Sequence, residues 1–144
     1  MQLWDFLQSV ITGKLFSARE LAAVRNEVSF SEAIAAHLSW KLNLTNALAG
    51  RAERMPNPDE IGDDTRCILG QWIHGPGQER YGYFSSYAEL RQRHEHFHHL
   101  ARQVVELTRE ERRGDAQRLL EGEFQEASRD IIAHLKLLSS LFGS

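Results

Sequence analysis

One cysteine and seven histidines are the residues of this 144-residue chain with the most chemical potential. A single cysteine cannot form an intrachain disulfide, so a reducing cytoplasm is the expected location of the protein. Imidazole nitrogen and thiolate sulfur are ligands that zinc commonly takes in proteins. The positions of these residues decide whether they gather into a metal site or are scattered over the fold.

Helical phase places three histidines and the cysteine on inward faces. His94 and His98 fall on the apolar stripe of one helical segment at i and i+4, and therefore share a face. His37 falls on the stripe of an earlier segment. Cys67 lies in a short segment that is apolar nearly all round and is expected to be a buried helix. Buried imidazoles need partners for their ring nitrogens, and one metal ion would serve them all.

The remaining histidines do not share this placement. His96 is about 200° from His94 around the helix axis, and His74, His96 and His99 are expected to be in solvent. His134 has a spacing that borders the core, and it is the reserve ligand if one of the four fails. Each inward histidine taken alone is more simply a core residue hydrogen-bonded to the backbone. It is the combination of all four residues that favours a metal.

The segments that must position these side chains are helical. Long stretches with a 3.6-residue period and only 3 prolines predict an all-α fold. The expected helices cover residues 31–54, 64–74, 86–113 and 115–141, with a shorter helical stretch or two within 3–27. Short turns between them predict an antiparallel four-helix bundle over residues 29–144. Residues 1–28 form a short N-terminal helical extension in this prediction.

The helix ends are predicted from capping and breaking residues. Capping boxes, in which a serine caps a backbone N–H and a glutamate reaches back, occur at Ser17–Glu20, Ser29–Glu32 and Ser86–Glu89. Helix stops are predicted at Met55–Asp59, at His74–Gly77 and at Gly114, the last with a new start at Asp115.

Composition excludes several classes of protein. The chain has 17 Lys+Arg against 20 Asp+Glu, a formal net charge of −3, which argues against nucleic acid as the main partner. No apolar run approaches the roughly 20 residues of a membrane span. The N-terminus lacks the charged region and cleavage site of a secretory signal.

Three motifs in order resemble the chemoreceptor zinc-binding (CZB) domain. They are His37-Leu-Ser-Trp-Lys41, Cys67-Ile-Leu-Gly-Gln-Trp72 and His94-Glu-His-Phe-His98. The resemblance covers about residues 31–140 and implies a four-helix bundle that often forms homodimers. It also implies that one zinc ion has four ligands, namely His37, Cys67, His94 and His98. Gly70 and Trp72 are expected to pack close to this site.

The resemblance also implies a regulatory function rather than an enzymatic one. Members of the family control chemoreceptor signalling domains or diguanylate cyclases, and they sense zinc or oxidants. This chain has no room for an output domain, so it is either a free-standing protein that acts on a separate partner or a fragment of a longer one. The starting Met and the N-terminal extension favour the free-standing protein. The signal is then zinc occupancy, oxidation of Cys67, or both.

Three alternatives stay open at the level of sequence. A zinc-stabilised bundle could act as an interaction module without sensing anything. The Glu95-x-x-His98 motif is one copy of a di-iron motif, although that architecture needs two copies and further inward glutamates. A hydrolase with Cys67 as nucleophile would need an oxyanion loop and an orienting acid, and neither is apparent in the sequence.

Overall fold

A computed structural model describes residues 30–51 and 54–142, and over this part of the chain the protein is helical without strands. The helices are α3 (Phe30–Leu48), α4 (Pro58–Gly62), α5 (Ile68–His74), α6 (Pro76–Tyr81), α7 (Ser85–Arg109), α8 (Arg113–Glu121) and α9 (Glu123–Phe142). The predicted all-α class is confirmed. The predicted N-terminal extension, the Ser17–Glu20 box and Ser29 lie outside the described residues.

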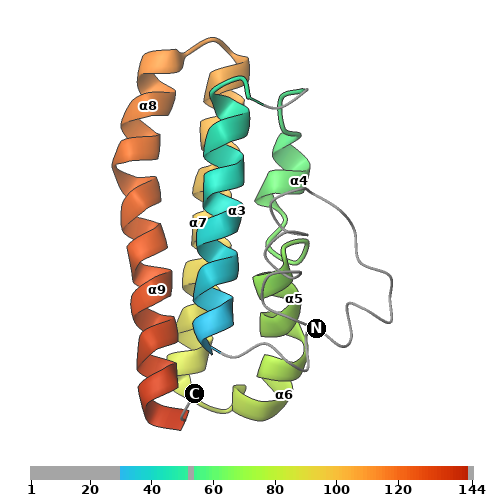
Figure 1. Ribbon diagram of the computed structural model, residues 1–144, viewed down its shortest axis with the longest axis vertical. Coiled ribbons are helices and arrows are strands. Elements are labelled where there is room, and N and C mark those ends of the chain that lie inside the picture. Colours follow the sequence, from blue (N-terminus) through green and yellow to red (C-terminus); the bar gives the residue numbers. More distant parts are fainter. Residues whose placement is uncertain (1–29, 52–53, 143–144) are drawn as a thin grey trace.

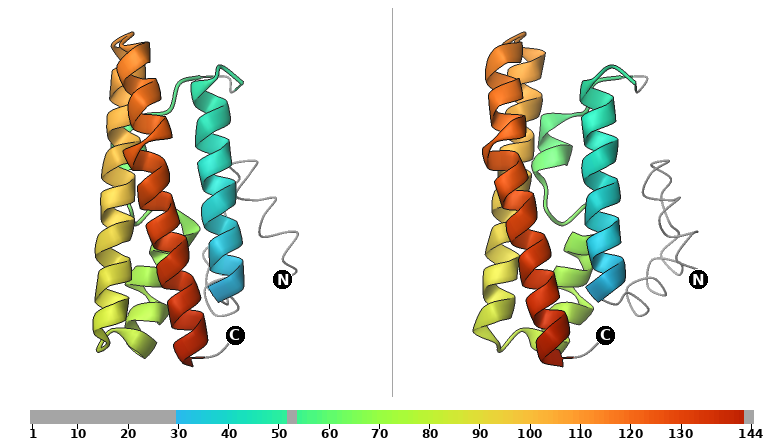
Figure 2. Two further views of the ribbon diagram at one scale, coloured as in Figure 1. Left: turned by 90° about the vertical axis from the view of Figure 1, so that its left-hand side faces the viewer. Right: turned by 60° about the vertical axis from the view of Figure 1, so that its left-hand side comes forward.

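The helices form a bundle with four positions, as Figure 1 shows. Helix α3 and helix α7 run in one direction, while the α4–α6 series and the α8–α9 pair run in the other. Helix α7 packs against α9 and α4, and α3 packs against α9 and α5, so α3 and α7 occupy opposite corners. Figure 2 shows the short helices α4–α6 stacked end to end in the position of one long helix. This arrangement matches the predicted antiparallel four-helix bundle.

The core runs between all four positions. Phe97 of α7 stacks on Phe124 of α9 with ring centroids 4.8 Å apart, and both rings are fully buried. Ile73 of α5 and Leu135 of α9 are also fully buried. Each buried side chain of this size contributes about 1.5–3 kcal/mol relative to an exposed one. The core packing therefore does not depend on any single polar cluster.

The first helix is shorter than predicted. Helix α3 ends at Leu48, not at residue 54, because Gly50 adopts the left-handed conformation with φ of 81°. The N–H of Arg51 donates to the carbonyl of Asn46, and the N–H of Gly50 donates to that of Ala47. This pair of bonds is a Schellman motif, which closes a helix without proline. The Met55–Asp59 segment then contains a new start, with Asn57 as the N-cap of α4.

Helix α7 also differs from its predicted ends. It begins at Ser85 with Phe84 as N-cap, so the capping box predicted from Ser86 is wrong. It ends at Arg109, because Glu111 takes the left-handed conformation with φ of 63°. The N–H of the residue after Glu111 donates to the carbonyl of Leu107, which again closes a Schellman motif. A glutamate is uncommon at such a position, and the sequence therefore pointed to the nearby glycine instead.

Two further boundaries were missed. The predicted stop at His74 is confirmed, but Pro76 begins the additional helix α6, where a missing N–H costs nothing. The predicted helix 115–141 is two helices, α8 and α9, separated by Gly122 with φ of −100° and ψ of −102°. Gly114, predicted to end a helix, lies inside α8.

Candidate metal centre

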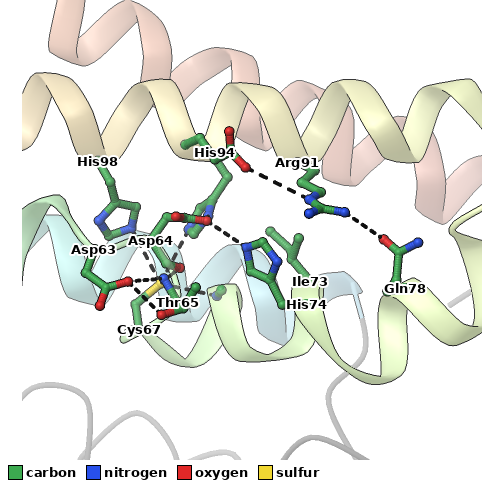
Figure 3. Close-up of polar contacts among 12 residues, drawn as sticks. Asp63, Asp64, Thr65, Cys67, Ile73, His74, Gln78, Arg91, His94 and His98 are labelled. Carbon is green, nitrogen blue, oxygen red and sulfur yellow. Dashed lines mark hydrogen bonds and ion pairs between the residues drawn. The ribbon is translucent and has the colours of Figure 1, made fainter.

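Three of the four predicted ligands converge between the N-terminus of α5 and the middle of α7, as Figure 3 shows for Cys67, His94 and His98. The Sγ of Cys67 is 3.3 Å from Nε2 of His94 and 3.5 Å from Nε2 of His98. Zinc–sulfur and zinc–nitrogen bonds of about 2.3 and 2.0–2.1 Å at a tetrahedral angle would separate sulfur from nitrogen by roughly 3.5 Å. The observed separations therefore fit zinc.

Cys67 is the N-cap of α5 and not part of the helix, which corrects the prediction of a buried helical cysteine. Its φ and ψ are −79° and 159°, and its Sγ accepts the N–H of Gly70 at 3.2 Å. The residue is only partly buried. A helix N-terminus favours the thiolate over the thiol, because its free N–H groups point at the sulfur.

Gly70 allows the chain before α5 to fold back onto this helix. A Cβ at position 70 would overlap the carbonyl oxygen of Asp64 and lie 3.1 Å from Cε1 of His94. The expected packing of Gly70 beside the site is confirmed on this geometry. Trp72, two residues later, is buried against Tyr87 and Phe30 and lies in the core.

The turn that contains Asp64 is stabilised by hydrogen bonds from polar side chains within the turn. Asp63 accepts the backbone N–H of Thr65 at 3.0 Å and the hydroxyl of Thr65 at 2.6 Å. Aspartate commonly forms such local turns. The turn fixes the chain immediately before Cys67, and Figure 3 shows Asp63, Thr65 and Cys67 together.

His98 is oriented by the backbone on one side and by an aromatic ring on the other. Its Nδ1–H donates to the carbonyl of Ile61 at 2.8 Å, which leaves Nε2 free as a ligand. Trp40 of α3 packs on the imidazole with centroids 4.6 Å apart. Metal-binding histidines usually donate their second N–H to a carbonyl or carboxylate in this way.

His94 faces a carboxylate on the side away from Cys67. Its Nδ1 lies 3.8 Å from Oδ2 of Asp64, and the same oxygen is 2.8 Å from Nε2 of His74. Among the described residues, Nδ1 of His94 has no hydrogen-bond partner although the side chain is 1% exposed. His74 is therefore paired with Asp64 and only partly exposed, contrary to the prediction of a solvated residue.

Charge at the cluster favours the ionised thiol. Burial opposes ionisation of Cys67, but the neighbouring His94 and His98 outweigh it and lower the pKa of the thiol to about 5. Burial likewise opposes protonation of His94, but the Cys67 thiolate and the Asp64 carboxylate raise the pKa of His94 to about 9. A thiolate is thus available to bind a metal ion or to meet an oxidant near neutral pH.

His37 lies at the same cavity but is bonded elsewhere. A cavity of about 10 Å³, room for one small occupant, is lined by residues that include His37, Cys67, His94 and His98. The Nε2 of His37 nevertheless lies 2.8 Å from the hydroxyl of Ser128 on α9. Burial, with smaller contributions from nearby cations, lowers the pKa of His37 to about 3. The structure therefore brings three predicted ligands together and holds the fourth, as a neutral imidazole, against Ser128.

The other histidines lie outside this cluster. His96 and His99 are exposed, as predicted. The reserve ligand His134 bonds to the carboxylate of Glu89 at 2.9 Å and to a backbone carbonyl. Glu95, the acid of the single di-iron-like motif, is half-exposed and does not join Cys67 and His98.

Sequence reasoning missed Asp64, Ile61 and Ser128 as neighbours of the ligands. Asp64 precedes Cys67 in a non-helical connection, where helical phase carries no information about direction. Ile61 lies in α4, a short helix that the sequence did not predict, and contacts His98 through its backbone carbonyl. Ser128 lies on the buried face of α9 at the helical spacing of Phe124 and Ile131. A search for polar residues on apolar stripes would have found Ser128, but not its pairing with His37.

Comparison with known proteins gives one match. Residues 37–105 match the family model described as the chemoreceptor zinc-binding domain. The matched region contains all four predicted ligands and begins at His37. No curated protein and no solved structure shows significant similarity to the chain.

Proposed function

Because residues 37–105 belong to the chemoreceptor zinc-binding domain family, we propose that this chain is a regulatory module whose His₃Cys zinc site senses zinc, oxidants or both. The observation that supports this proposal most strongly is the convergence of Cys67, His94 and His98 at separations that suit tetrahedral zinc. Zinc binding is a property of the family, and the donor set is one that zinc prefers.

The proposed fourth ligand is His37, which changes its partner when the site is filled. In the structure its Nε2 is committed to Ser128, while its ring already lies at the cavity and packs on Phe97 with centroids 4.7 Å apart. Release of the Ser128 bond would free this nitrogen for coordination. His37 belongs to α3 and Ser128 to α9, so the exchange alters a polar link between two long helices.

The sensing step depends on differential binding. A ligand shifts a conformational equilibrium only by its difference in affinity for the two states. The two states proposed here differ in whether His37 contacts Ser128 or the metal. When bound, zinc supplies a cation that keeps the Cys67 thiol ionised and ties α5 to α7.

The same thiolate is the proposed target of oxidants. Attack of the Cys67 thiolate on hypochlorous acid forms the S–O bond of a sulfenic acid and releases chloride, so the sulfur is oxidised and the chlorine reduced. Cys67 as a residue is only partly buried, and this step requires the oxidant to reach its sulfur. Sulfenic acid formation removes the only sulfur ligand, and we expect it to weaken the site.

The proposed partners are those of the family. A chemoreceptor or a diguanylate cyclase would receive the signal, and a second copy of this chain would complete a homodimer. The described part of the chain contains no helix that is long and apolar enough to cross a membrane. The family is a regulatory rather than a known catalytic one, and the proposal assigns Cys67 no role as a hydrolytic nucleophile.

A structural zinc site without sensing is the second candidate function. Its support is the burial of His94 and His98, which resembles a closed structural site more than an open one. The two candidates differ in what happens to the fold when the metal is removed.

The test of the proposed function is metal content together with oxidation. Purified protein should contain one zinc, and Cys67→Ala and His94→Ala should lose it, whereas the exposed control His96→Ala should keep it. Mild hypochlorite should then modify Cys67, as seen by mass spectrometry, and release zinc from the wild-type protein. Retention of zinc in both ligand variants would overturn the site, and an unmodified Cys67 with zinc still bound would overturn oxidant sensing.

A further inference from the structure

We propose that Asp64, His74 and Glu95 form a second site for a divalent transition-metal ion, on the outer side of His94 and separate from the cysteine site.

Three different elements contribute one ligand atom each to this outer site. Asp64 lies in the turn before α5, His74 is the last residue of α5, and Glu95 lies on α7. One oxygen or nitrogen of each residue lies within 4.8 Å of the others. The Asp64 and His74 side chains are 19% and 25% exposed and that of Glu95 is 51% exposed, so an ion can reach the site from solvent.

The buried nitrogen of His94 supports this assignment independently of the cluster. Nδ1 of His94 is enclosed, lacks a hydrogen-bond partner among the described residues and lies 3.8 Å from Oδ2 of Asp64. Figure 3 shows Asp64 between the rings of His94 and His74. A cation on the outer side would fix this carboxylate between the two rings, where it can accept the proton of His94 Nδ1.

The donor set determines the class of ion. Two carboxylates and one imidazole supply a charge of −2, which neutralises a divalent cation, and the set contains no sulfur. Imidazole favours zinc, nickel and cobalt over magnesium and calcium, which prefer oxygen ligands alone. The ion would lie against the Nε2 of His74 and the carboxylate of Asp64, which are 2.8 Å apart, and nothing is oxidised or reduced.

The outer site is expected to bind more weakly than the cysteine site. Glu95 is half-exposed and lies 3.9 Å from Arg91, so its side chain must give up this ion pair and become ordered. The described residues supply three protein ligands, and water would complete the coordination. The outer site would therefore fill only at a higher metal concentration than the cysteine site.

Cobalt and zinc titrations of the 144-residue chain without an affinity tag test the outer site. The first equivalent of Co²⁺ should produce a sulfur-to-cobalt charge-transfer band, and a second, weaker equivalent should add none. His74→Ala and Glu95→Gln should lose the second equivalent of Co²⁺ and of Zn²⁺ but keep the first. His96→Ala, which removes an exposed histidine of α7 outside both clusters, should keep both equivalents.

The outcomes separate this inference from the proposed function. A wild-type protein that binds a single equivalent, or a second equivalent that persists in both His74→Ala and Glu95→Gln, would overturn the outer site. Loss of the charge-transfer band alone would instead contradict the cysteine site. Glu95 is half-exposed on the helix surface, so Glu95→Gln keeps the test valid if His74→Ala fails to fold.

Discussion

The residue that controls the position of the Cys67 thiol most directly is Gly70. An added Cβ would collide with a backbone oxygen of the preceding turn, which cannot move as a flexible side chain can. We expect Gly70→Ala to lower the free energy of unfolding by about 1–3 kcal/mol. Zinc affinity should fall roughly 10–100-fold, because the backbone turn beside Cys67 and His94 is displaced.

Gly114→Ala is the matched control for this substitution. A Cβ at Gly114 would meet only an Arg118 guanidinium nitrogen, at 3.7 Å, inside α8. Its stability should stay within about 1 kcal/mol of the wild type. Chelator competition and thermal melting check both variants, and equal behaviour of the two would show that the close approach at Gly70 is unimportant.

His37 makes the metal-free protein sensitive to acid. Burial lowers the pKa of His37 from 6.5 to about 3 in the folded protein, so between these pH values the unfolded chain binds a proton that the folded one does not. Stability is therefore lost as the pH falls below about 6.5, by up to about 1.4 kcal/mol per pH unit. His37→Gln can still form a hydrogen bond to Ser128, and it should remove the loss of stability at low pH that His37 causes.

Urea unfolding of the zinc-free protein between pH 7 and pH 4 measures the effect. The exposed His96→Gln is the control and should keep the wild-type slope. If His37→Gln and the wild type lose stability in parallel, His37 is not the group that takes up the proton.

For single residues, the sequence predicted which way a side chain points wherever the residue lies within a helix. His94 and His98 are inward because their spacing keeps both on the buried face of α7. Asp64 was not predicted as a neighbour of His94, since it reaches this residue through a turn. The bond between His37 and Ser128 was not predictable either, because helical phase identifies an inward face but not the partner across the core.

Between elements, α3 and α9 share a polar link that should compete with metal binding. Removal of the Ser128 hydroxyl leaves Nε2 of buried His37 without its partner, at a cost of about 1–3 kcal/mol to the metal-free state. The metal-bound state proposed here has already given up that bond. Ser128→Ala should therefore bind zinc about tenfold more tightly, because 1.4 kcal/mol corresponds to a factor of ten.

A chelator-competition assay measures this difference, with Ser140→Ala as the control on the exposed face of α9. Within residues 30–51 and 54–142, the hydroxyl of Ser140 donates only to the carbonyl of Leu137, away from the site, so its loss should leave the affinity unchanged. Unchanged affinity in Ser128→Ala would contradict the exchange of partners by His37.

The four positions of the bundle and the directions of the helices were predicted better than the number and extent of the helices. Apolar periodicity reflects the buried faces of α3, α7 and α9, and it is insensitive to where a helix closes. The ends of α3 and α7 each depend on one residue in the left-handed conformation, Gly50 and Glu111. Glycine is common at such a position and glutamate is not. The α4–α6 series was only partly predicted, because short helices show too few turns for a period to emerge.

For the whole molecule, we expect the helical core to stay folded when the metal is removed. The buried core cluster contains residues of α3, α5, α7 and α9, and Cys67 only packs against it as a partly buried residue. Zinc removal by a chelator should leave the helical circular dichroism nearly unchanged and lower the melting temperature by several degrees. Loss of most helical signal on chelation would favour the purely structural zinc site.

The central claim, one zinc held by three imidazoles and the Cys67 thiolate, is tested most directly by zinc X-ray absorption spectroscopy of protein containing one equivalent. We expect one sulfur neighbour at about 2.3 Å and three nitrogen neighbours at about 2.0–2.1 Å. The sulfur contribution should vanish in Cys67→Ala. A wild-type spectrum with only nitrogen and oxygen neighbours would show that Cys67 does not bind the zinc ion.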